Sequence, residues 1–295
     1  MEMIYQSGAT FRQALEEYIR NTYQQQGTPI SRIRKLIVFE RFIARLSKVA
    51  PENWALKGGL SLELRLGTYA RSTKDMDFMI PEEEEHIYNL LLESSKLNLQ
   101  DFFEFNIHKP QPGNANLITG KRYLAESRLD GRIFEQFHID VGGEDILLEA
   151  PDFLPMPSYL SFAGLESIMV PCYPVAQQIA EKYHAATKEY RSGVSSRVKD
   201  VVDILILACH SILSCRKLRN AIINTFTLRG THELPVRVIE IDPSYQQSFS
   251  SLAKQVSLPF TRIEEANGAL LSFLDPVLFS EKELTWNPHT FSWED

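Results

Sequence analysis

The segment Asp75-Met76-Asp77-Phe78 constrains the fold more than any other part of the sequence. Polar and apolar residues alternate through it until Pro81, which predicts a half-buried β-strand. Because successive side chains of a strand point to opposite faces, Asp75 and Asp77 share one face while Met76 and Phe78 enter the core. We therefore expect two carboxylates to converge on one spot at the face of a sheet.

A glycine pair precedes these carboxylates by sixteen residues, counted from Gly59 to Asp75. The short apolar run Trp54 to Lys57 predicts a strand, and Gly58-Gly59 would lead from it into a helix whose N-terminal amides can approach an anion. Taken singly, the glycine pair is an ordinary turn and the acidic pair is a solvent-facing strand edge. Their combination, together with Arg71 and Thr73 just before the carboxylates, favours a site for a triphosphate and a hard divalent cation such as Mg²⁺. The cation would relieve the repulsion between the carboxylates.

The rest of the chain divides into a mixed half and a helical half. Apolar residues at spacings of three and four predict helices at 9–25, 30–49 and 82–97. Residues 101–141 carry strand signals, and Asp130-Gly131 between two apolar runs is typical of a tight turn joining antiparallel strands. Later helical patterns cover 175–190, 197–213, 216–226, 245–256 and 262–274. The sequence predicts an α+β fold, with a mixed sheet and flanking helices in the N-terminal half and a helical C-terminal half.

Asp140 is the candidate for a third carboxylate, on the second arm of the predicted hairpin, with Glu144 and Asp145 as alternatives. In two-metal phosphoryl transfer a third carboxylate serves the ion that activates the attacking hydroxyl, or acts as a base. The plainer interpretation of Asp140 is a strand-end residue that makes a turn hydrogen bond.

Lys182, Asp200 and Asp203 lie on two of the later helical segments. Lys182 would bind phosphate, and either aspartate would orient it or a bound base. Ordinary ion pairing on helix surfaces is the alternative. Because a partly exposed lysine contributes little packing, we expect Lys182 to matter for nucleotide use more than for folding.

Formal net charge is −7 over 295 residues, so contact with nucleic acid needs a local basic surface. Two groups of basic residues offer such a surface, or else the solvated faces of their helices: Arg32, Arg34, Lys35, Arg41, Arg45 and Lys48 near the start, and Lys188, Arg191, Arg197 and Lys199 later. Three cysteines without CxxC spacing and an N-terminus without a signal-like apolar core predict a cytoplasmic location. The most apolar stretch, 201–213, is shorter than the roughly 20 residues that span a bilayer, so we expect no membrane association.

Three blocks of the sequence resemble the AbiEii/AbiGii family of nucleotidyltransferase-fold toxins from bacterial toxin-antitoxin and abortive-infection pairs. They are LKGGLSLELRLGTYARSTKDMDFMI at 56–80, Ile139-Asp140-Val141, and AEKYHAATKEYRSGVSSRVKDVVDILIL at 180–207. The resemblance implies one set of residues by the triphosphate and the metals: Gly58, Gly59, Ser61, Asp75, Asp77 and Asp140. It implies a second set that contacts the nucleotide or completes the site: Lys182, Asp200 and Asp203. Asp200 ranks before Asp203, and Leu60 stands where many members have Ser or Thr.

The resemblance implies that a nucleoside monophosphate is transferred from a nucleoside triphosphate (NTP) to a hydroxyl acceptor, with two Mg²⁺ ions. We expect a catalytic domain over 1–170 and a helical domain over 171–295 that closes the nucleotide site. RNA, especially tRNA, is the implied acceptor, and a cognate antitoxin is the implied partner. Two alternatives stay open: a small-molecule acceptor such as an antibiotic, and a non-catalytic nucleotide-binding or protein-interaction module on the same fold.

Overall fold

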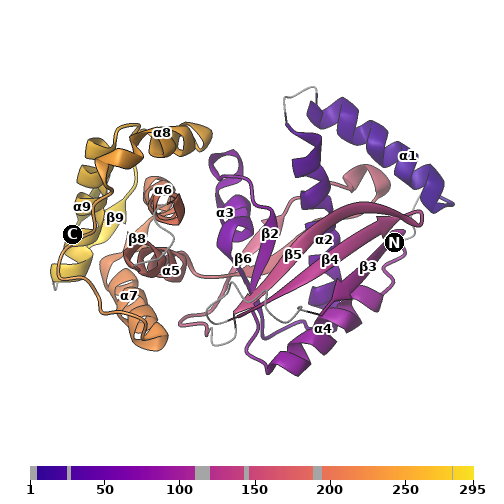
Figure 1. Ribbon diagram of the computed structural model, residues 1–295, viewed down its shortest axis with the longest axis horizontal. Coiled ribbons are helices and arrows are strands. Elements are labelled where there is room, and N and C mark those ends of the chain that lie inside the picture. The colour runs from indigo at the N-terminus through magenta and orange to yellow at the C-terminus, as the bar shows by residue number, and fades with distance from the viewer. Residues whose placement is uncertain (1–4, 25–27, 110–119, 143–145, 189–194, 281) are drawn as a thin grey trace. The chain divides into compact units, whose positions relative to one another are not determined.

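The computed structural model describes residues 5–24, 28–109, 120–142, 146–188, 195–280 and 282–295 (Figure 1). The chain forms two compact units, each of which draws on separate parts of the sequence. The sheet unit comprises residues within 1–64, 72–146 and 153–172. The helical unit comprises 65–71, 147–152 and 173–295.

The sheet unit is built on a mixed sheet, which has seven strands among the described residues, in the order β3-β4-β5-β2-β1-β7-β6. The strands are β1 (Ala55–Lys57), β2 (Asp75–Met79), β3 (Phe103–His108), β4 (Gly120–Leu129), β5 (Arg132–Gly142), β6 (Asp152–Met156) and β7 (Ile168–Cys172). Strand β2 pairs parallel with β5 and antiparallel with β1, and β1 pairs parallel with β7. The predicted mixed sheet is confirmed, and β2, which carries the acidic pair, lies inside it.

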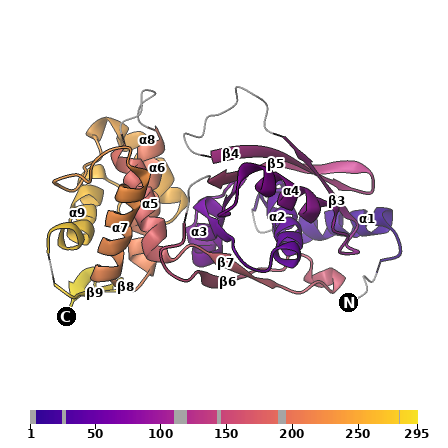
Figure 2. The same cartoon turned by 90° about the horizontal axis from the view of Figure 1, so that it is seen from below.

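Strands β4 and β5 form the predicted hairpin and run side by side (Figure 2). Its turn residues Asp130 and Gly131 both have positive φ, 55° and 67°, as a two-residue hairpin turn requires. The pairing shifts between Ser127 and Arg128. Phe134 is the extra residue on β5, and it is buried. This β-bulge sets the register of all the pairs beyond it, from Ser127–Glu135 to Gly120–Gly142.

Four α-helices belong wholly or largely to the described part of the sheet unit: α1 (Gly8–Ile19), α2 (Ile30–Val49), α3 (Gly58–Leu66) and α4 (Glu84–Lys96). Helix α1 continues into a π-helical turn (Arg20–Gln24). Helix α2 packs on the sheet through aromatic contacts, with ring centroids of Phe39 and Phe137 5.3 Å apart and those of Phe42 and Phe105 5.5 Å apart. The first of these contacts holds α2 against β5, the strand that carries Asp140.

Two basic residues of α2, Arg41 and Arg45, are buried and so lie outside any surface of the kind that the sequence suggested for nucleic acid. Arg45 is fully buried and donates to both oxygens of Asp101, at 2.9 and 2.6 Å. Arg41 donates to Asp101 Oδ2 at 2.7 Å. Burial raises the pKa of Asp101, but the two arginines outweigh it and hold that pKa below its usual range. The charges of Arg41 and Arg45 are therefore used inside the unit, because a buried carboxylate needs partners.

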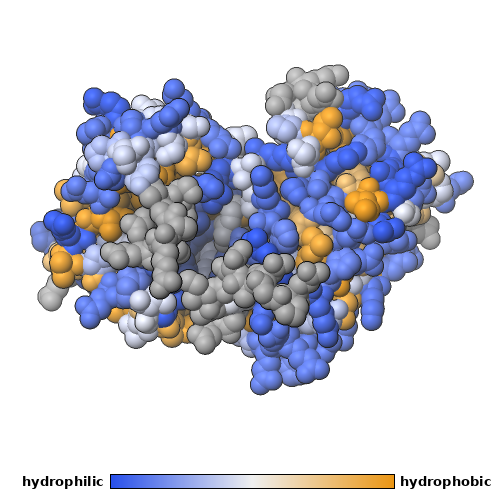
Figure 3. Space-filling model, in the orientation of Figure 1, coloured by the Kyte–Doolittle hydropathy of each residue, from blue (hydrophilic) through white to orange (hydrophobic). Residues whose placement is uncertain are grey.

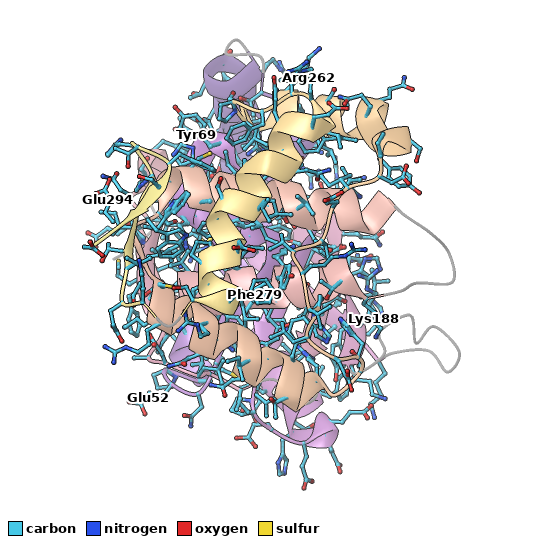
Figure 4. The ribbon with its side chains drawn as sticks, turned by 90° about the vertical axis from the view of Figure 1, so that its left-hand side faces the viewer. Glu52, Tyr69, Lys188, Arg262, Phe279 and Glu294 are labelled. Carbon is cyan, nitrogen blue, oxygen red and sulfur yellow. The ribbon has the colours of Figure 1, made fainter. Side chains whose placement is uncertain are left out.

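The described part of the helical unit contains a small three-stranded sheet of β8 (Leu213–Ser214), β9 (Thr285–Asn287) and β10 (Ser292–Glu294) beside its main helices. The helices are α5 (Val175–Thr187), α6 (Ser195–His210), α7 (Cys215–Arg229), α8 (Gln246–Gln255) and α9 (Ile263–Phe279). Figure 4 looks onto α9, with Phe279 labelled at its C-terminal end. Trp286 of β9 is fully buried, and its Nε1 donates to the Ala208 carbonyl at 2.7 Å. The helical pattern predicted after residue 174 is confirmed.

Polar residues dominate the face shown in Figure 3, where hydrophobic side chains are scattered. Within the described parts of the chain, no helix is both long enough and apolar enough to cross a membrane.

Candidate active site

Strand β2 presents Asp75 and Asp77 on one face of the sheet. Both aspartates are partly exposed, whereas Met76 and Phe78 between and after them are fully buried. The alternation predicted from the sequence is confirmed. Two carboxylates on one face of a central strand form the first part of the candidate site.

The register places Asp77 in a row of charged residues that crosses four neighbouring strands. Lys57 at the end of β1 pairs with Asp77, Asp77 pairs with Asp140 of β5, and Asp140 pairs with Arg122 of β4. Paired residues of adjacent strands lie on the same face. The row therefore brings two carboxylates together between two cations, and it joins the predicted third carboxylate, Asp140, to the acidic pair.

Arg122 binds the carboxylates most directly. Its Nε and Nη2 donate to the two oxygens of Asp140 at 2.7 and 2.6 Å, and Nη2 lies 3.6 Å from Asp75 Oδ2. The hydrogen bonds to Asp140 raise the pKa of Arg122 against the opposing effect of burial, and the charges of Asp75 and Asp77 raise it further. The guanidinium is thus the cation on which Asp140 and Asp75 converge.

Asp75 has a second neighbour, His138 of β5, whose Nδ1 lies 3.3 Å from Asp75 Oδ1. Among the residues that the structure describes, no three acidic, histidine or cysteine side chains are already arranged to hold a metal ion. Asp140 is turned toward Arg122 in this arrangement. The alternative acids Glu144 and Asp145 lie outside the described residues.

Gly58 and Gly59 form the start of α3 and lie against the same strand and the loop before it. Gly58 has φ of +63°, and a Cβ there would lie 2.0 Å from Asp77 Oδ2. A Cβ on Gly59 would lie 2.8 Å from Thr73 Oγ1, which donates to the Asp75 carbonyl at 3.0 Å. Only glycine leaves the two aspartates in place.

Ser61, the third residue expected beside the triphosphate, is fully buried. Its Oγ has no hydrogen-bond partner among the described residues. Of the three residues expected there, Ser61 has the least structural support for contact with a nucleotide.

The helical unit holds the second group of expected site residues around Lys182 of α5. Its Nζ lies 3.1 Å from Asp200 Oδ1 and 2.8 Å from Asp203 Oδ2, both on α6. Arg71 donates from Nε and Nη2 to the two oxygens of Asp203, each at 3.0 Å. This network joins two helices and the 65–71 segment, so it is not the surface pairing along one helix that was the alternative.

The two aspartates of this network differ in their surroundings. Burial raises the pKa of both carboxyls, but Lys182 and Arg71 outweigh burial at Asp203, whose pKa is lowered, whereas that of Asp200 stays raised. Burial opposes the charge of Lys182, yet Asp203 and Asp200 outweigh it and raise the lysine pKa. Asp203 is 1 % exposed and held by two cations, whereas the Asp200 side chain is 14 % exposed. Asp203 therefore holds Lys182 and Arg71 together inside the unit, whereas part of the Asp200 side chain remains accessible to solvent.

The sequence did not predict that Arg122 contacts Asp140, or that Arg71 contacts Asp203. Arg71 was noticed only for its place before the acidic pair, and its contact with Asp203 spans 132 residues of sequence. Arg122 lies opposite Asp140 only because of the bulge in the hairpin. The Asp130-Gly131 turn was the available signal, and without the bulge it would have placed Arg122 opposite Ile139.

Residues 41–272 match the family described as the nucleotidyl transferase AbiEii toxin of type IV toxin-antitoxin systems. The chain belongs to the AbiEii family. It is therefore a nucleotidyltransferase, as the sequence motifs predicted. No curated protein matches the sequence significantly.

Among solved structures, MenT4, a nucleotidyltransferase toxin from Mycobacterium tuberculosis, is 17% identical with a TM-score of 0.48, covering 69% of this chain and 68% of that one. JHP933 from Helicobacter pylori is 14% identical with a TM-score of 0.44, covering 82% and 91%. The antibiotic-resistance factor ANT(2'')-Ia is 13% identical with a TM-score of 0.35, covering 65% and 94%. Family membership rests on the match over residues 41–272.

Proposed function

We propose that this AbiEii-family enzyme transfers a nucleoside monophosphate from an NTP to a hydroxyl of RNA, such as tRNA, and releases diphosphate, in a Mg²⁺-dependent reaction in the cytoplasm. We further propose that a cognate antitoxin restrains it. The observation that carries the chemistry is the row in which Asp77 and Asp140 pair across parallel strands, with Asp75 on the same face. The type IV toxin-antitoxin description of the family supports the toxin role.

The residues present fit a hard divalent cation. Asp75, Asp77 and Asp140 offer the carboxylate oxygens that Mg²⁺ prefers, and a guanidinium already stands between Asp140 and Asp75 as a cation. Two Mg²⁺ ions held by these three residues would neutralise the triphosphate and make the acceptor hydroxyl a better nucleophile. Without a cation, three carboxylates on one face repel one another.

The remaining site residues position the substrate in this proposal. Gly58 and Gly59 open α3, and the first amides of that helix would bind phosphate oxygens of the NTP. Lys182 would contact the nucleotide, and Asp200 would orient the lysine through their 3.1 Å contact. Asp203 would hold Lys182 in place from the buried side.

The test is transfer of label from α-labelled NTPs to total bacterial RNA. Each of the four NTPs is incubated with the protein, Mg²⁺ and RNA, and the products are separated by size. We expect label in an RNA fraction with the wild type and none with Asp77→Asn, which keeps the shape of the side chain and removes its charge. Glu104→Gln, at an exposed position of β3 in the same sheet, is the matched control and should label RNA like the wild type.

The same assay separates the alternative acceptors. Label on RNA that survives in Asp77→Asn would contradict the carboxylate assignment. No label on RNA, together with label on an added aminoglycoside, would replace the RNA acceptor with a small molecule. Tight nucleotide binding without any transfer would contradict turnover of these substrates.

A further inference from the structure

Arg122 holds the position in which the proposed function requires a metal ion. Its guanidinium uses both oxygens of Asp140, at 2.7 and 2.6 Å, and reaches Asp75 Oδ2 at 3.6 Å. Asp140 and Asp75 are two of the three residues assigned to the metals. Bidentate guanidinium–carboxylate pairs are among the stronger hydrogen-bonded contacts in proteins. A cation of another kind can reach these oxygens fully only after Arg122 has given up part of this contact.

We propose that Arg122 is an internal counter-ion that occupies the metal position in the metal-free protein and is displaced when the divalent ion binds. This inference rests on the proposed function, because it takes Asp75, Asp77 and Asp140 as the metal ligands. It adds a residue to the site that the sequence motifs do not contain.

The metal-free carboxylates need such a counter-ion. The side chain of Asp140 is only 11 % exposed, so an unpaired charge there would be costly. Asp77 is its register partner and Asp75 lies on the same face, so further negative charge is close by. A cation on β4 therefore stabilises the fold before any metal arrives.

The side chain of Arg122 is also placed so that it can leave. It is 40 % exposed, whereas that of Asp140 stays mostly covered. A long arginine side chain can turn its head into water while its stem stays on the strand. The carboxylates then remain fixed by the sheet register while the cation changes from guanidinium to metal.

Arg128 offers a matched control on the same strand. Six residues from Arg122, it lies on the same face of β4 because the bulge is on β5. Its side chain is 39 % exposed and its Nε donates to Glu126 Oε1 at 2.8 Å. Its replacement removes one arginine–carboxylate pair of similar exposure, away from the proposed metal ligands.

The experiment compares wild type, Arg122→Met, Arg122→Lys and Arg128→Met by Mn²⁺ titration, using calorimetry and the loss of the free-ion electron paramagnetic resonance signal. We expect Arg122→Met to bind Mn²⁺ about tenfold more tightly than wild type or more, since a charge-assisted contact no longer has to be broken. Arg122→Lys, which keeps the charge without the planar fork, should fall between them. Arg128→Met should bind like the wild type.

Thermal unfolding in chelator gives an independent readout. Arg122→Met should melt at a lower temperature than wild type without metal, and Mn²⁺ should raise its melting temperature by more than it raises that of the wild type. Equal or weaker Mn²⁺ binding by Arg122→Met, with wild type and Arg128→Met binding normally, would overturn the counter-ion and leave the proposed function standing. Failure of all four proteins to bind Mn²⁺, with or without NTP, would overturn the metal site and the counter-ion together.

Discussion

Gly58 and Asp77 lie so close that a single methyl group on Gly58 would come within 2.0 Å of the Asp77 carboxylate. The glycine follows β1 directly and opens α3, and the aspartate is in the adjacent strand β2. The glycine motif and the acidic motif, which are separated in the sequence, therefore pack directly against each other in the fold. The absence of a side chain at residue 58 is what leaves room for the carboxylate.

We predict that Gly58→Ala removes nucleotidyl transfer because the methyl group pushes the Asp77 carboxylate out of the row. Gly67→Ala is the control, since Gly67 has nearly the same φ, +59°, but nothing lies within 4 Å of its added Cβ. Both changes should cost about 1–2 kcal/mol of stability through the left-handed backbone alone. Thermal melts and the RNA-labelling assay measure the two effects, and wild-type transfer by Gly58→Ala would contradict the packing argument.

We predict that Lys182→Met destabilises the helical unit by about 3 kcal/mol, because it leaves two mostly buried aspartates with less positive charge. The sequence alone predicted instead that Lys182 contributes little to folding. The control is Lys217→Met. The side chains of Lys217 and its partner Glu149 are 63 % and 45 % exposed, so loss of this ion pair should cost under about 1 kcal/mol. Chemical denaturation measures both, and Lys182→Arg should recover stability. Equal stability of the two methionine variants would show that the network contributes nothing.

We predict a stability change with pH that is due to Glu40 on α2. Burial raises the pKa of this carboxyl from 4.5 to about 7, against the opposing charge of Arg41. The folded protein therefore binds the proton more tightly than the unfolded chain. The resulting stabilisation is complete below pH 4.5 and is lost as the pH rises through about 7.

Glu40→Gln should remove this pH dependence. The free energy of unfolding of the variant minus that of the wild type should rise by about 1–3 kcal/mol between pH 5 and pH 8. Denaturation at pH 5, 6, 7 and 8 measures the slope. Glu104→Gln, on an exposed position of β3, should leave the slope as in the wild type. Parallel curves for wild type and Glu40→Gln would contradict a raised pKa at residue 40.

We predict that induced expression in bacteria slows growth and that Asp77→Asn abolishes the effect. An unregulated enzyme that modifies essential RNA hydroxyls would deplete a resource needed in every round of translation. Growth curves measure the effect, with the folded state of the variant checked by its melting curve. Toxicity that persists in folded Asp77→Asn would point to aggregation or sequestration of a partner. Transfer activity without any effect on growth would contradict the proposed toxin role and leave the proposed transfer reaction standing.

The local part of the fold was predictable from sequence, because it depends on periodicity and turn chemistry. The helix at 30–49 and the hairpin turn at Asp130-Gly131 follow from those signals and are confirmed. Strand β7 was not predicted: it is five residues long, contains Pro171, and pairs in parallel with β1 more than a hundred residues earlier. Such a pairing leaves no local pattern in the sequence.

The candidate site shows the same division. The common face of Asp75 and Asp77 follows from strand alternation, a local property. The pairing of Arg122 with Asp140 depends on one extra residue, Phe134, which a simple reading of the hairpin does not include. The contact between Arg71 and Asp203 depends on how distant segments fold together. The common face of the two motif aspartates was predictable, and the arginines that pair with Asp140 and Asp203 were not.

The way the backbone alternates between the two units limits how the protein can be dissected. It passes from one unit to the other at 64–65, 71–72, 146–147, 152–153 and 172–173. A fragment that stops at residue 172 keeps Arg71 but lacks its partner Asp203. A fragment that starts at residue 173 keeps Asp203 but lacks Arg71. The fragment 1–172 therefore contains every segment of the sheet unit, but the fragment that starts at 173 lacks two segments of the helical unit, 65–71 and 147–152. The helical unit would therefore have to be produced together with the part of the chain that precedes it, because that part supplies Arg71.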